Sequence, residues 1–278
     1  MAASLAPPCH SALSPPPLRL AARHSPFRAS SLPLHPRGMM RGAVRRAAQG
    51  VRAGVAEAGG EPAPMGQVTR YNDSFIDLAL MGLFRRKMEQ QIGEVATRKR
   101  GYEAFVEVSR RVMQGRSAAE QRAIVANVLV SLLPPNAPAT FRKWFPPSKW
   151  SAEINAAITV PGFQWLVGPC QLKEVEVNGQ KQMSGVQITK CRYLEVSGCV
   201  GMCVNMCKLP TQDFFTNDFG LPLTMTPNFE NMSCEMVFGQ MPPPLSEDPA
   251  LSQPCFAALC SMAQPEADKC PRVPDATP

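Results

Sequence analysis

The segment CRYLEVSGCVGMCVNMCK, residues 191–208, holds four of the ten cysteines in this 278-residue chain. Three of them, Cys199, Cys203 and Cys207, recur at every fourth position. On an α-helix such residues are offset by about 40° per step, so their side chains stack along one face. The segment therefore predicts a cysteine-bearing helix from 198 to 208, which follows a strand that runs toward Cys191.

Three stacked thiols are suited to hold a metal, provided that another residue completes the site. A Cys₄ zinc site or an iron–sulfur cluster needs a fourth ligand. The candidates for it are Cys191, Cys234, Cys255 and Cys260. The spacing differs from the paired cysteines of zinc sites and from both common ferredoxin patterns, so it does not identify the metal.

Two other interpretations of the cysteines stay open. Free cysteine is among the most buried residue types, and the interleaved Met202 and Met206 are typical of a core helix. Disulfides are less favoured because β-carbons four residues apart in a helix lie about 5–6 Å from each other, whereas a disulfide needs about 3.8 Å. Spacing alone leaves metal binding, buried thiols and disulfides as alternatives.

The N-terminal segment has a different composition. Residues 1–56 contain eight arginines, six serines and eight prolines but no acidic residue. This pattern predicts a chloroplast transit peptide over 1–56, with a basic arm that binds nucleic acid as the alternative. Residues 57–70 are expected to be a linker. All 22 acidic residues follow this segment together with 21 of the 29 basic ones, so the remainder is nearly neutral and has no electrostatic reason to bind nucleic acid.

Histidine is confined to the predicted transit peptide. His10, His24 and His35 are the only three in the chain. Ser-His-Asp and Cys-His catalysis, HExxH zinc sites and histidine-rich iron sites are therefore excluded for the remainder. Any metal there must be bound by Cys, Asp, Glu or backbone groups.

The rest of the chain predicts an α+β fold in one catalytic domain, residues 71–278. Residues 71–168 are expected to be mostly helical, with a Ser/Asx cap before the first helix, a capping box at Ser117 and Glu120, and a short helix over 148–159. Residues 169–278 are expected to form a hairpin around Asn178-Gly179 and a cysteine-rich part, with a second short helix capped by Thr211. The helical half would pack with a small antiparallel hairpin or sheet and the cysteine-bearing helix.

An uncharged stretch from 154 to 172 is long enough to span a membrane. Pro161-Gly162 and its polar residues argue against a span. A buried helix followed by a loop is favoured over a patch on a membrane surface.

Three segments together resemble one known family. They are CRYLEVSGCVGMCVNMCKLPTQDFF (191–215), PNFENMSCEMVFGQMPPPLSEDP (227–249) and QPCFAALC (253–260). The chain from about Tyr71 onward resembles the plant plastid beta-carotene isomerases of strigolactone biosynthesis, which influence shoot branching. The resemblance implies an iron-containing plastid enzyme that interconverts all-trans- and 9-cis-beta-carotene, with a carotenoid cleavage dioxygenase using the cis product. With it, iron on Cys199, Cys203 and Cys207 becomes the leading hypothesis, and it implies no specific catalytic residue.

The implied substrate is a hydrocarbon, so its recognition must depend on shape and apolar burial, and a peripheral membrane contact is expected. One turnover per second requires a barrier of about 17 kcal/mol, so the enzyme must lower the order of a double bond temporarily. Protonation would need a carboxylic acid such as Glu195, Glu230 or Glu235, whereas electron exchange with iron needs no acid. A plastid iron–sulfur electron carrier or scaffold and a zinc-stabilised interaction module are the alternatives.

Overall fold

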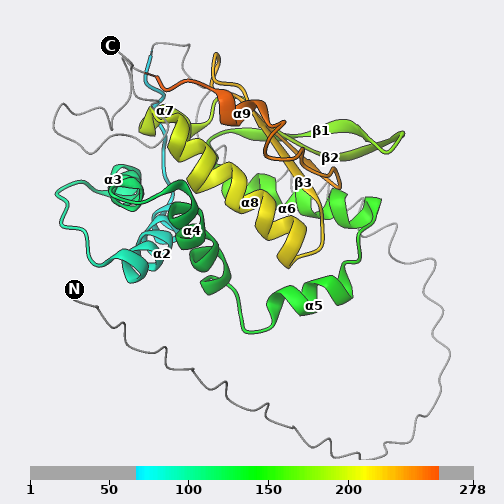
Figure 1. The fold of residues 1–278 in the computed structure, drawn as a ribbon, viewed down its shortest axis with the longest axis horizontal. Coiled ribbons are helices and arrows are strands. Elements are labelled where there is room, and N and C mark those ends of the chain that lie inside the picture. Colours follow the sequence, from blue (N-terminus) through cyan, green and yellow to red (C-terminus); the bar gives the residue numbers. More distant parts are fainter. Residues whose placement is uncertain (1–66, 257–278) are drawn as a thin grey trace, which may run out of the picture. The chain divides into compact units, whose positions relative to one another are not determined.

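The computed structural model of the chain describes residues 67–256, which form a mixed α and β fold as the sequence predicts. In Figure 1, helices α2 (Phe75–Ile92), α3 (Gly101–Met113) and α4 (Ala118–Ser131) gather at one end. The sheet and α6 (Lys149–Val167) lie at the other end. A long helix that contains α8 runs between them. The predicted transit peptide over 1–56 and Cys260 lie outside the described residues.

Two capping boxes start helices in the N-terminal part. Ser74 accepts the backbone N–H of Asp77, and the Asp77 carboxylate accepts the N–H of Ser74. Ser117 and Glu120 make the same exchange at the start of α4. Each box satisfies amides that the first helical turn leaves without partners. Both predicted helix starts are confirmed.

The sheet is antiparallel throughout, with the strand order β1-β2-β4-β3. Its strands are β1 (Cys170–Val177), β2 (Gln180–Ile188), β3 (Leu223–Pro227) and β4 (Cys234–Phe238). Asn178 and Gly179 join β1 to β2 with φ values of 51° and 75°. Positive φ at both positions is the requirement of a type I′ turn, so the predicted hairpin is confirmed.

The β1–β2 hairpin contains an irregularity that requires a glycine. Lys173 pairs with Gly185 but Val175 pairs with Gln182, so β2 carries one extra residue there. A β-carbon on Gly185 would lie 2.6 Å from Cγ1 of Val175 and 2.9 Å from the carbonyl oxygen of Lys173. The backbone of Lys173 cannot yield as a flexible side chain can.

We expect Gly185→Ala to lower the free energy of unfolding by about 2 kcal/mol, because the added methyl group overpacks the hairpin. Gly82→Ala is the matched control, since nothing lies within 4 Å of a β-carbon at that helical position. It should be neutral or stabilising by about 0.5–1 kcal/mol. Urea unfolding measures both. Equal stability of the two variants would contradict the steric explanation.

Helix α6 extends beyond the end that the sequence predicts. It continues past Thr159 to Val167 and contains Pro161. Trp165 is buried and makes edge contacts with the rings of Phe84, at 5.1 Å, and Phe105, at 6.1 Å. Packing of this last turn against α2 and α3 offsets the cost of the missing proline N–H. Within residues 67–256, no helix combines the length and the apolar composition that a membrane span requires.

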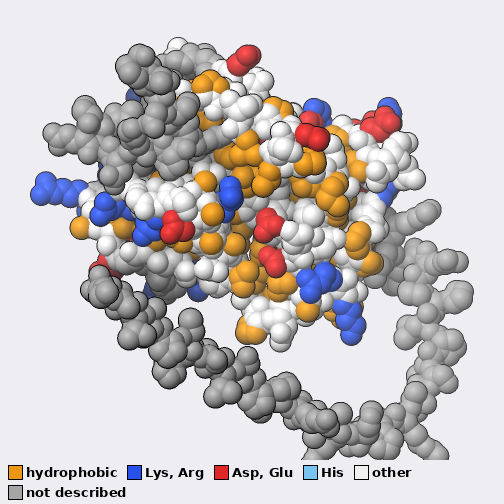
Figure 2. Space-filling view, in the orientation of Figure 1, with side chains coloured by type: hydrophobic (Ala, Val, Ile, Leu, Met, Phe, Trp, Pro, Cys, Tyr) orange, Lys and Arg blue, Asp and Glu red, His pale blue; other side chains and the backbone are white. Residues whose placement is uncertain are grey.

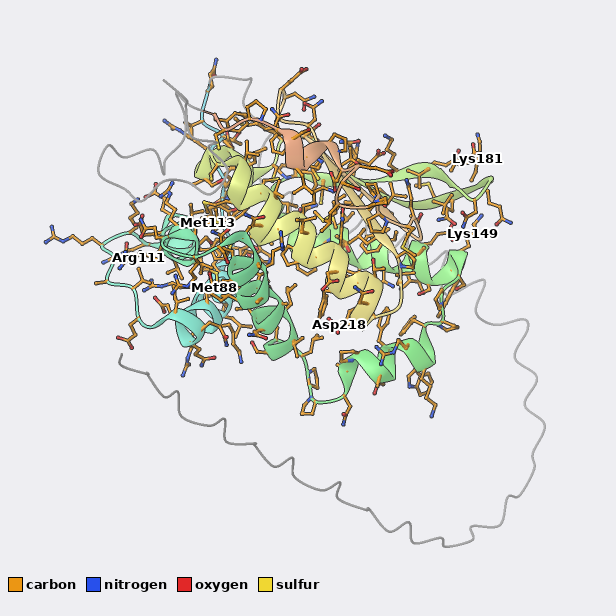
Figure 3. The ribbon with its side chains drawn as sticks, viewed as in Figure 1. Met88, Arg111, Met113, Lys149, Lys181 and Asp218 are labelled. Atoms are coloured by element: carbon orange, nitrogen blue, oxygen red, sulfur yellow. The ribbon has the colours of Figure 1, made fainter. Side chains whose placement is uncertain are left out.

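Helix α5 (Ala137–Trp144) has no buried residue and is held through aromatic rings. Phe141 stacks on Phe219 with centroids 4.3 Å apart, and Phe145 stacks on Trp150 at 5.4 Å. At the start of α6, Nζ of Lys149 donates to the carbonyl of Lys181 at 2.8 Å, and Figure 3 labels both residues. These contacts connect α5 and α6 to the rest of the fold.

The cysteine segment enters a longer helix than the sequence predicts. After α7 (Arg192–Ser197), one unbroken helix covers 200–218 and comprises Val200-Gly201, the π-helical η2 (Met202–Lys208), α8 (Leu209–Asp213) and the π-helical η3 (Phe214–Asp218). The predicted separate helix capped by Thr211 is therefore wrong. The π-helical η2 ends directly before Leu209 and Pro210. Its wide turn accommodates Pro210, which has no N–H to donate. The short helix α9 (Pro249–Ser252) follows the sheet.

Residues 67–73, which precede α2, pack against α7. The backbone N–H and the hydroxyl of Thr69 each donate to Glu195 at 3.0 Å. The Nζ of Lys190 forms a buried ion pair with Glu195 at 2.7 Å. The composition of residues 57–70 predicts a linker, but Thr69 is almost fully buried. Glu195 binds it because a buried carboxylate requires several donors.

Arg192 completes the attachment of this segment. Its guanidinium makes two hydrogen bonds to the carboxylate of Asp73, at 2.5 and 2.8 Å. It also lies over the rings of Tyr71 and Tyr102, with centroid distances of 4.2 and 3.9 Å. Arg192 therefore connects the chain before α2 to α3 and α7.

Glu195→Gln should lower the free energy of unfolding by about 3 kcal/mol at neutral pH, because Lys190 would stay buried without its counterion. Although burial alone would raise the pKa of Glu195, Lys190 and Thr69 hold that pKa below its usual value of 4.5. The stabilisation is thus present above pH 4.5 and is lost as pH falls through the lower, folded-state pKa.

The free energies of parent and variant should accordingly converge as pH falls from 4.5 through that lower pKa, which urea unfolding at several pH values measures. Lys173→Gln, in the more exposed pair with Glu235, is the control and should change stability by less than about 1 kcal/mol. A difference between parent and Glu195→Gln that does not depend on pH would refute the electrostatic explanation.

Candidate active site

Four cysteines from three parts of the chain line one internal cavity of about 20 Å³. Cys191 precedes α7, Cys203 and Cys207 lie on η2, and Cys234 begins β4. We call this space the thiol cavity. The register of the sheet brings Cys191 and Cys234 together. Cys234 pairs with Ile188 on β2, and the N–H of Cys191 donates to the carbonyl of Met232, two residues before Cys234, at 2.7 Å.

These four cysteines differ from Cys199, Cys203 and Cys207, the trio that the sequence favours as iron ligands. Cys199 is buried but does not line the thiol cavity. It precedes the first helical residue, Val200, and its carbonyl accepts the N–H of Cys203 at 3.2 Å. Cys199 therefore occupies the N-cap position, where the backbone leaves the helical path. The regular helical spacing of Cys203 and Cys207 does not extend back to Cys199. Cys255 does not line the cavity either.

Burial keeps the four thiols protonated at neutral pH. It raises the pKa of Cys207 to about 12, and it raises the pKa of Cys203 and Cys234 well above the usual value. The pKa of Cys191 is raised by the same cause. The nearby ammonium of Lys208 lowers the pKa of Cys203 and Cys234, but burial outweighs it. The structure therefore holds a neutral group of thiols rather than thiolate nucleophiles.

Lys208 is the cation in the wall of the thiol cavity. Its Nζ forms a buried ion pair with Asp248 at 2.6 Å and donates to Oε1 of Gln212 at 2.9 Å. That oxygen also accepts the N–H of Met225 at 2.8 Å. The charge of Lys208 is thus balanced next to the thiols. Sequence reasoning missed this residue, because a single lysine after a cysteine carries no recognisable signal.

Within 67–256, no three His, Cys, Asp or Glu side chains are arranged so that they could hold a metal ion. The chemistry of the donors nevertheless fits iron, since four thiols are the ligand set of iron–sulfur centres. Binding would require the four side chains to change rotamer and to lose their protons. The cavity has room for about one small group, so a cluster would also require it to expand.

A second, apolar cavity of about 70 Å³ adjoins the thiol cavity. Tyr193 and Cys207 line both spaces. The other walls come from α2, α3, α4, the end of α6 and the long helix, with Phe84, Met88, Phe105, Val125, Val128, Leu129, Leu166 and Met206 among them. Met88 and Met113, which Figure 3 labels, are buried where α2, α3 and α4 meet. Cys207 therefore presents a thiol to an apolar space.

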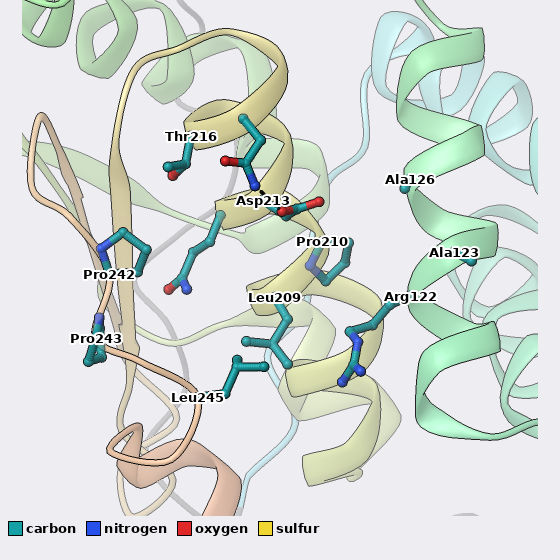
Figure 4. Close-up of a pocket in the computed structure, with 12 residues that line it drawn as sticks. Arg122, Ala123, Ala126, Leu209, Pro210, Asp213, Thr216, Pro242, Pro243 and Leu245 are labelled. Carbon is teal, nitrogen blue, oxygen red and sulfur yellow. Dashed lines mark hydrogen bonds between the residues drawn. The ribbon is translucent and has the colours of Figure 1, made fainter.

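A larger cleft, of about 410 Å³, lies elsewhere. It separates α4 from α8 and from the loop that carries Pro242, Pro243 and Leu245, as Figure 4 shows. Hydrophobic side chains also gather over the centre of this face in Figure 2. No cysteine lines the cleft, and Arg122 and Asp213 make it partly polar. The two smaller cavities are therefore the better candidate site for chemistry on an apolar molecule.

Three cavity thiols, those of Cys191, Cys203 and Cys234, should resist alkylation in the native protein. Because they are buried and protonated at pH 7.5, iodoacetamide should label them at least about 100-fold more slowly than the same residues in urea. Cys255, which is partly exposed, serves as the comparison. Pulsed labelling followed by peptide mass spectrometry measures each site. Rapid native labelling of Cys203 or Cys234 would show that the cavity is open.

Comparisons with known proteins add the family. Residues 165–247 match the family model described as "Beta-carotene isomerase D27-like, C-terminal", and all four cavity cysteines fall in that range. The chain is 38% identical to "Beta-carotene isomerase D27, chloroplastic" of Medicago truncatula over 72% of its own length and 79% of the relative. It is 40% identical to the Arabidopsis thaliana protein of the same description over 66% of its length and 70% of the relative. No solved structure gives a significant match. The chain belongs to the D27 family of beta-carotene isomerases.

Proposed function

We propose that this protein is a plastid enzyme that reversibly interconverts all-trans- and 9-cis-beta-carotene, an early step of strigolactone biosynthesis. The observation that carries the proposal is its likeness, at 38–40% identity, to chloroplastic proteins named beta-carotene isomerase. A carotenoid cleavage dioxygenase is the proposed consumer of the cis product. The arrangement of the two cavities supports a site at Cys207.

The apolar cavity suits part of a hydrocarbon. Beta-carotene offers no group for a hydrogen bond, so its binding depends on apolar contact and shape. The lining of phenylalanine, methionine, valine and leucine side chains meets that need. A cavity of about 70 Å³ holds a section of the polyene and not the whole molecule. The proposed binding therefore requires α2 or α4 to move outward.

The carboxylic acids that the sequence analysis considers are poorly placed for protonation of the polyene. Glu195 is bound by Lys190 and Thr69, and Glu235 is bound by Lys173 at 2.6 Å. Neither lines either cavity, and neither does Glu230. The titratable residues that line the apolar cavity are Cys207, whose thiol burial keeps protonated, and Tyr193. Tyr193, whose pKa burial also raises, stays neutral beside it.

For the cofactor, we propose iron on Cys191, Cys203, Cys207 and Cys234. Four thiols of one cavity supply a complete ligand set without histidine, and the cavity adjoins the apolar space. When bound, iron supplies one-electron exchange, which lowers the order of a polyene double bond without a proton donor. The protein would exclude water and hold the polyene against Cys207. An iron–sulfur carrier without isomerase activity is the alternative, but it does not need the apolar cavity.

The purified protein should convert all-trans-beta-carotene in detergent micelles to the 9-cis isomer, and it should run the reverse reaction. Cys207→Ser should lower the rate at least about 100-fold, because it changes the one thiol shared by both cavities. Cys170→Ser is the matched control, since Cys170 is half-buried and lines neither cavity. Chromatography of the isomers measures the rates.

Iron and acid-labile sulfide of protein purified without oxygen test the cofactor separately. Iron should fall to background in a Cys203→Ser, Cys234→Ser double variant and persist in Cys170→Ser. Iron without isomerase activity in the parent would favour the carrier. Activity that survives Cys207→Ser unchanged would remove the thiol cavity from the mechanism.

A further inference from the structure

Helix α2 exposes an apolar face near its start. Phe75 is 85% exposed, Ile76 68%, Leu78 47% and Leu83 42%. At 100° per residue these four, together with Ala79 and Gly82, lie on one side of the helix, opposite the buried Met81 and Met88. We call this side the α2 apolar face.

Such a face differs from the single exposed hydrophobic residues of an ordinary surface. Four large apolar side chains fall within nine residues, with Asp77 as the only charged residue among them. Asp77 is engaged in the capping box with Ser74 and is only half-exposed. Contiguous exposed apolar surface of this kind marks a site of interaction.

Basic residues lie next to the α2 apolar face at two places, later on α2 and just before α3. Arg86 continues the same side of the helix after Leu83, and Lys87 lies next to it. The exposed Arg98 and Arg100 precede α3, whose first residue, Gly101, has the Leu78 side chain beside it. Apolar side chains flanked by Lys and Arg are the pattern of a helix that lies on an anionic bilayer, with the cations at the headgroups.

We propose that α2 docks the protein on the surface of an anionic lipid bilayer, with Phe75, Ile76 and Leu83 inserted at the boundary between headgroups and acyl chains. The proposal rests on the proposed function, because beta-carotene is a hydrocarbon that dissolves in membranes. It gives α2 a second role. Phe84 and Met88, toward its other side, line the apolar cavity next to Cys207. One helix thus separates the lipid from the candidate site.

Vesicle flotation of the full-length chain tests the proposal with phosphatidylcholine vesicles that contain, or lack, phosphatidylglycerol. Phe75→Ser, Ile76→Ser is the test variant. Trp144→Ser, Ile158→Ser is the matched control, because these two residues are also large, apolar and exposed but lie on α5 and α6. Circular dichroism and urea unfolding confirm that both variants are folded.

The parent and the control should float with anionic vesicles, and the affinity of the test variant should fall at least about tenfold. The eight arginines of residues 1–56 also attract anionic lipid, so the comparison is repeated at about 0.5 M salt, where that attraction is screened. The difference between test variant and control should persist there. Arg86→Glu, Lys87→Glu should weaken binding at low salt and do so less at high salt.

Three results would overturn the proposal: binding of the test variant that equals the parent's, an equal loss in the control, or a parent dimer that only the test variant dissociates. The dimer, seen by light scattering, would make the face a contact between two copies of the chain. Isomerase activity in detergent micelles separates this proposal from the proposed function. An active test variant that fails to float supports α2 docking, whereas a parent that floats but is inactive contradicts only the proposed function.

Discussion

The arrangement of the site depends on the contacts of one buried charge, the guanidinium of Arg192. A charge in the interior must be partnered, and the partners of Arg192 come from separate parts of the chain: Asp73, Tyr71, Tyr102 and the carbonyl of Trp165. This requirement draws the segment before α2, the start of α3 and the end of α6 onto α7. Because Cys191 and Tyr193 flank Arg192 in the sequence, the same contacts set where both enter the cavities.

Burial decides the chemical state of the candidate site. Thiols exposed to water beside a lysine would ionise readily, but here burial raises their pKa values and Asp248 neutralises Lys208. The charge of Lys208 in the wall of the thiol cavity is thus balanced, and the cavity adjoins an apolar space at Cys207. A hydrocarbon can approach such a thiol without displacing an ion. The same neutrality explains why metal binding would require both deprotonation and movement of side chains.

The two cavities are built from different parts of the chain. The thiol cavity is built entirely from residues inside the range 165–247 that matches the family model. Most walls of the apolar cavity come from α2, α3 and α4, which lie before it. Under the proposed function, the C-terminal part would supply the reactive groups, and the helical part would supply the contact with the hydrocarbon. In the proposed docking, helix α2 would connect this contact to lipid, because it carries apolar side chains on its outward side as well as on its inward side.

The sequence by itself determined the local elements. The capping boxes at Ser74 and Ser117, the Asn178-Gly179 turn and the α+β class all followed from neighbouring residues, since caps and turns depend on contacts within a few positions. The even spacing of Cys199, Cys203 and Cys207 indicated one helical face, but it could not reveal that the helix begins at Val200 or that η2 is π-helical. Only the tertiary structure replaced Cys199 by Cys191 and Cys234 in the cavity, extended α6 through Pro161 and balanced Lys208 with Asp248. These outcomes depend on the pairing of β2 with β4 and on burial between segments far apart in the chain, which contacts between neighbouring residues do not set.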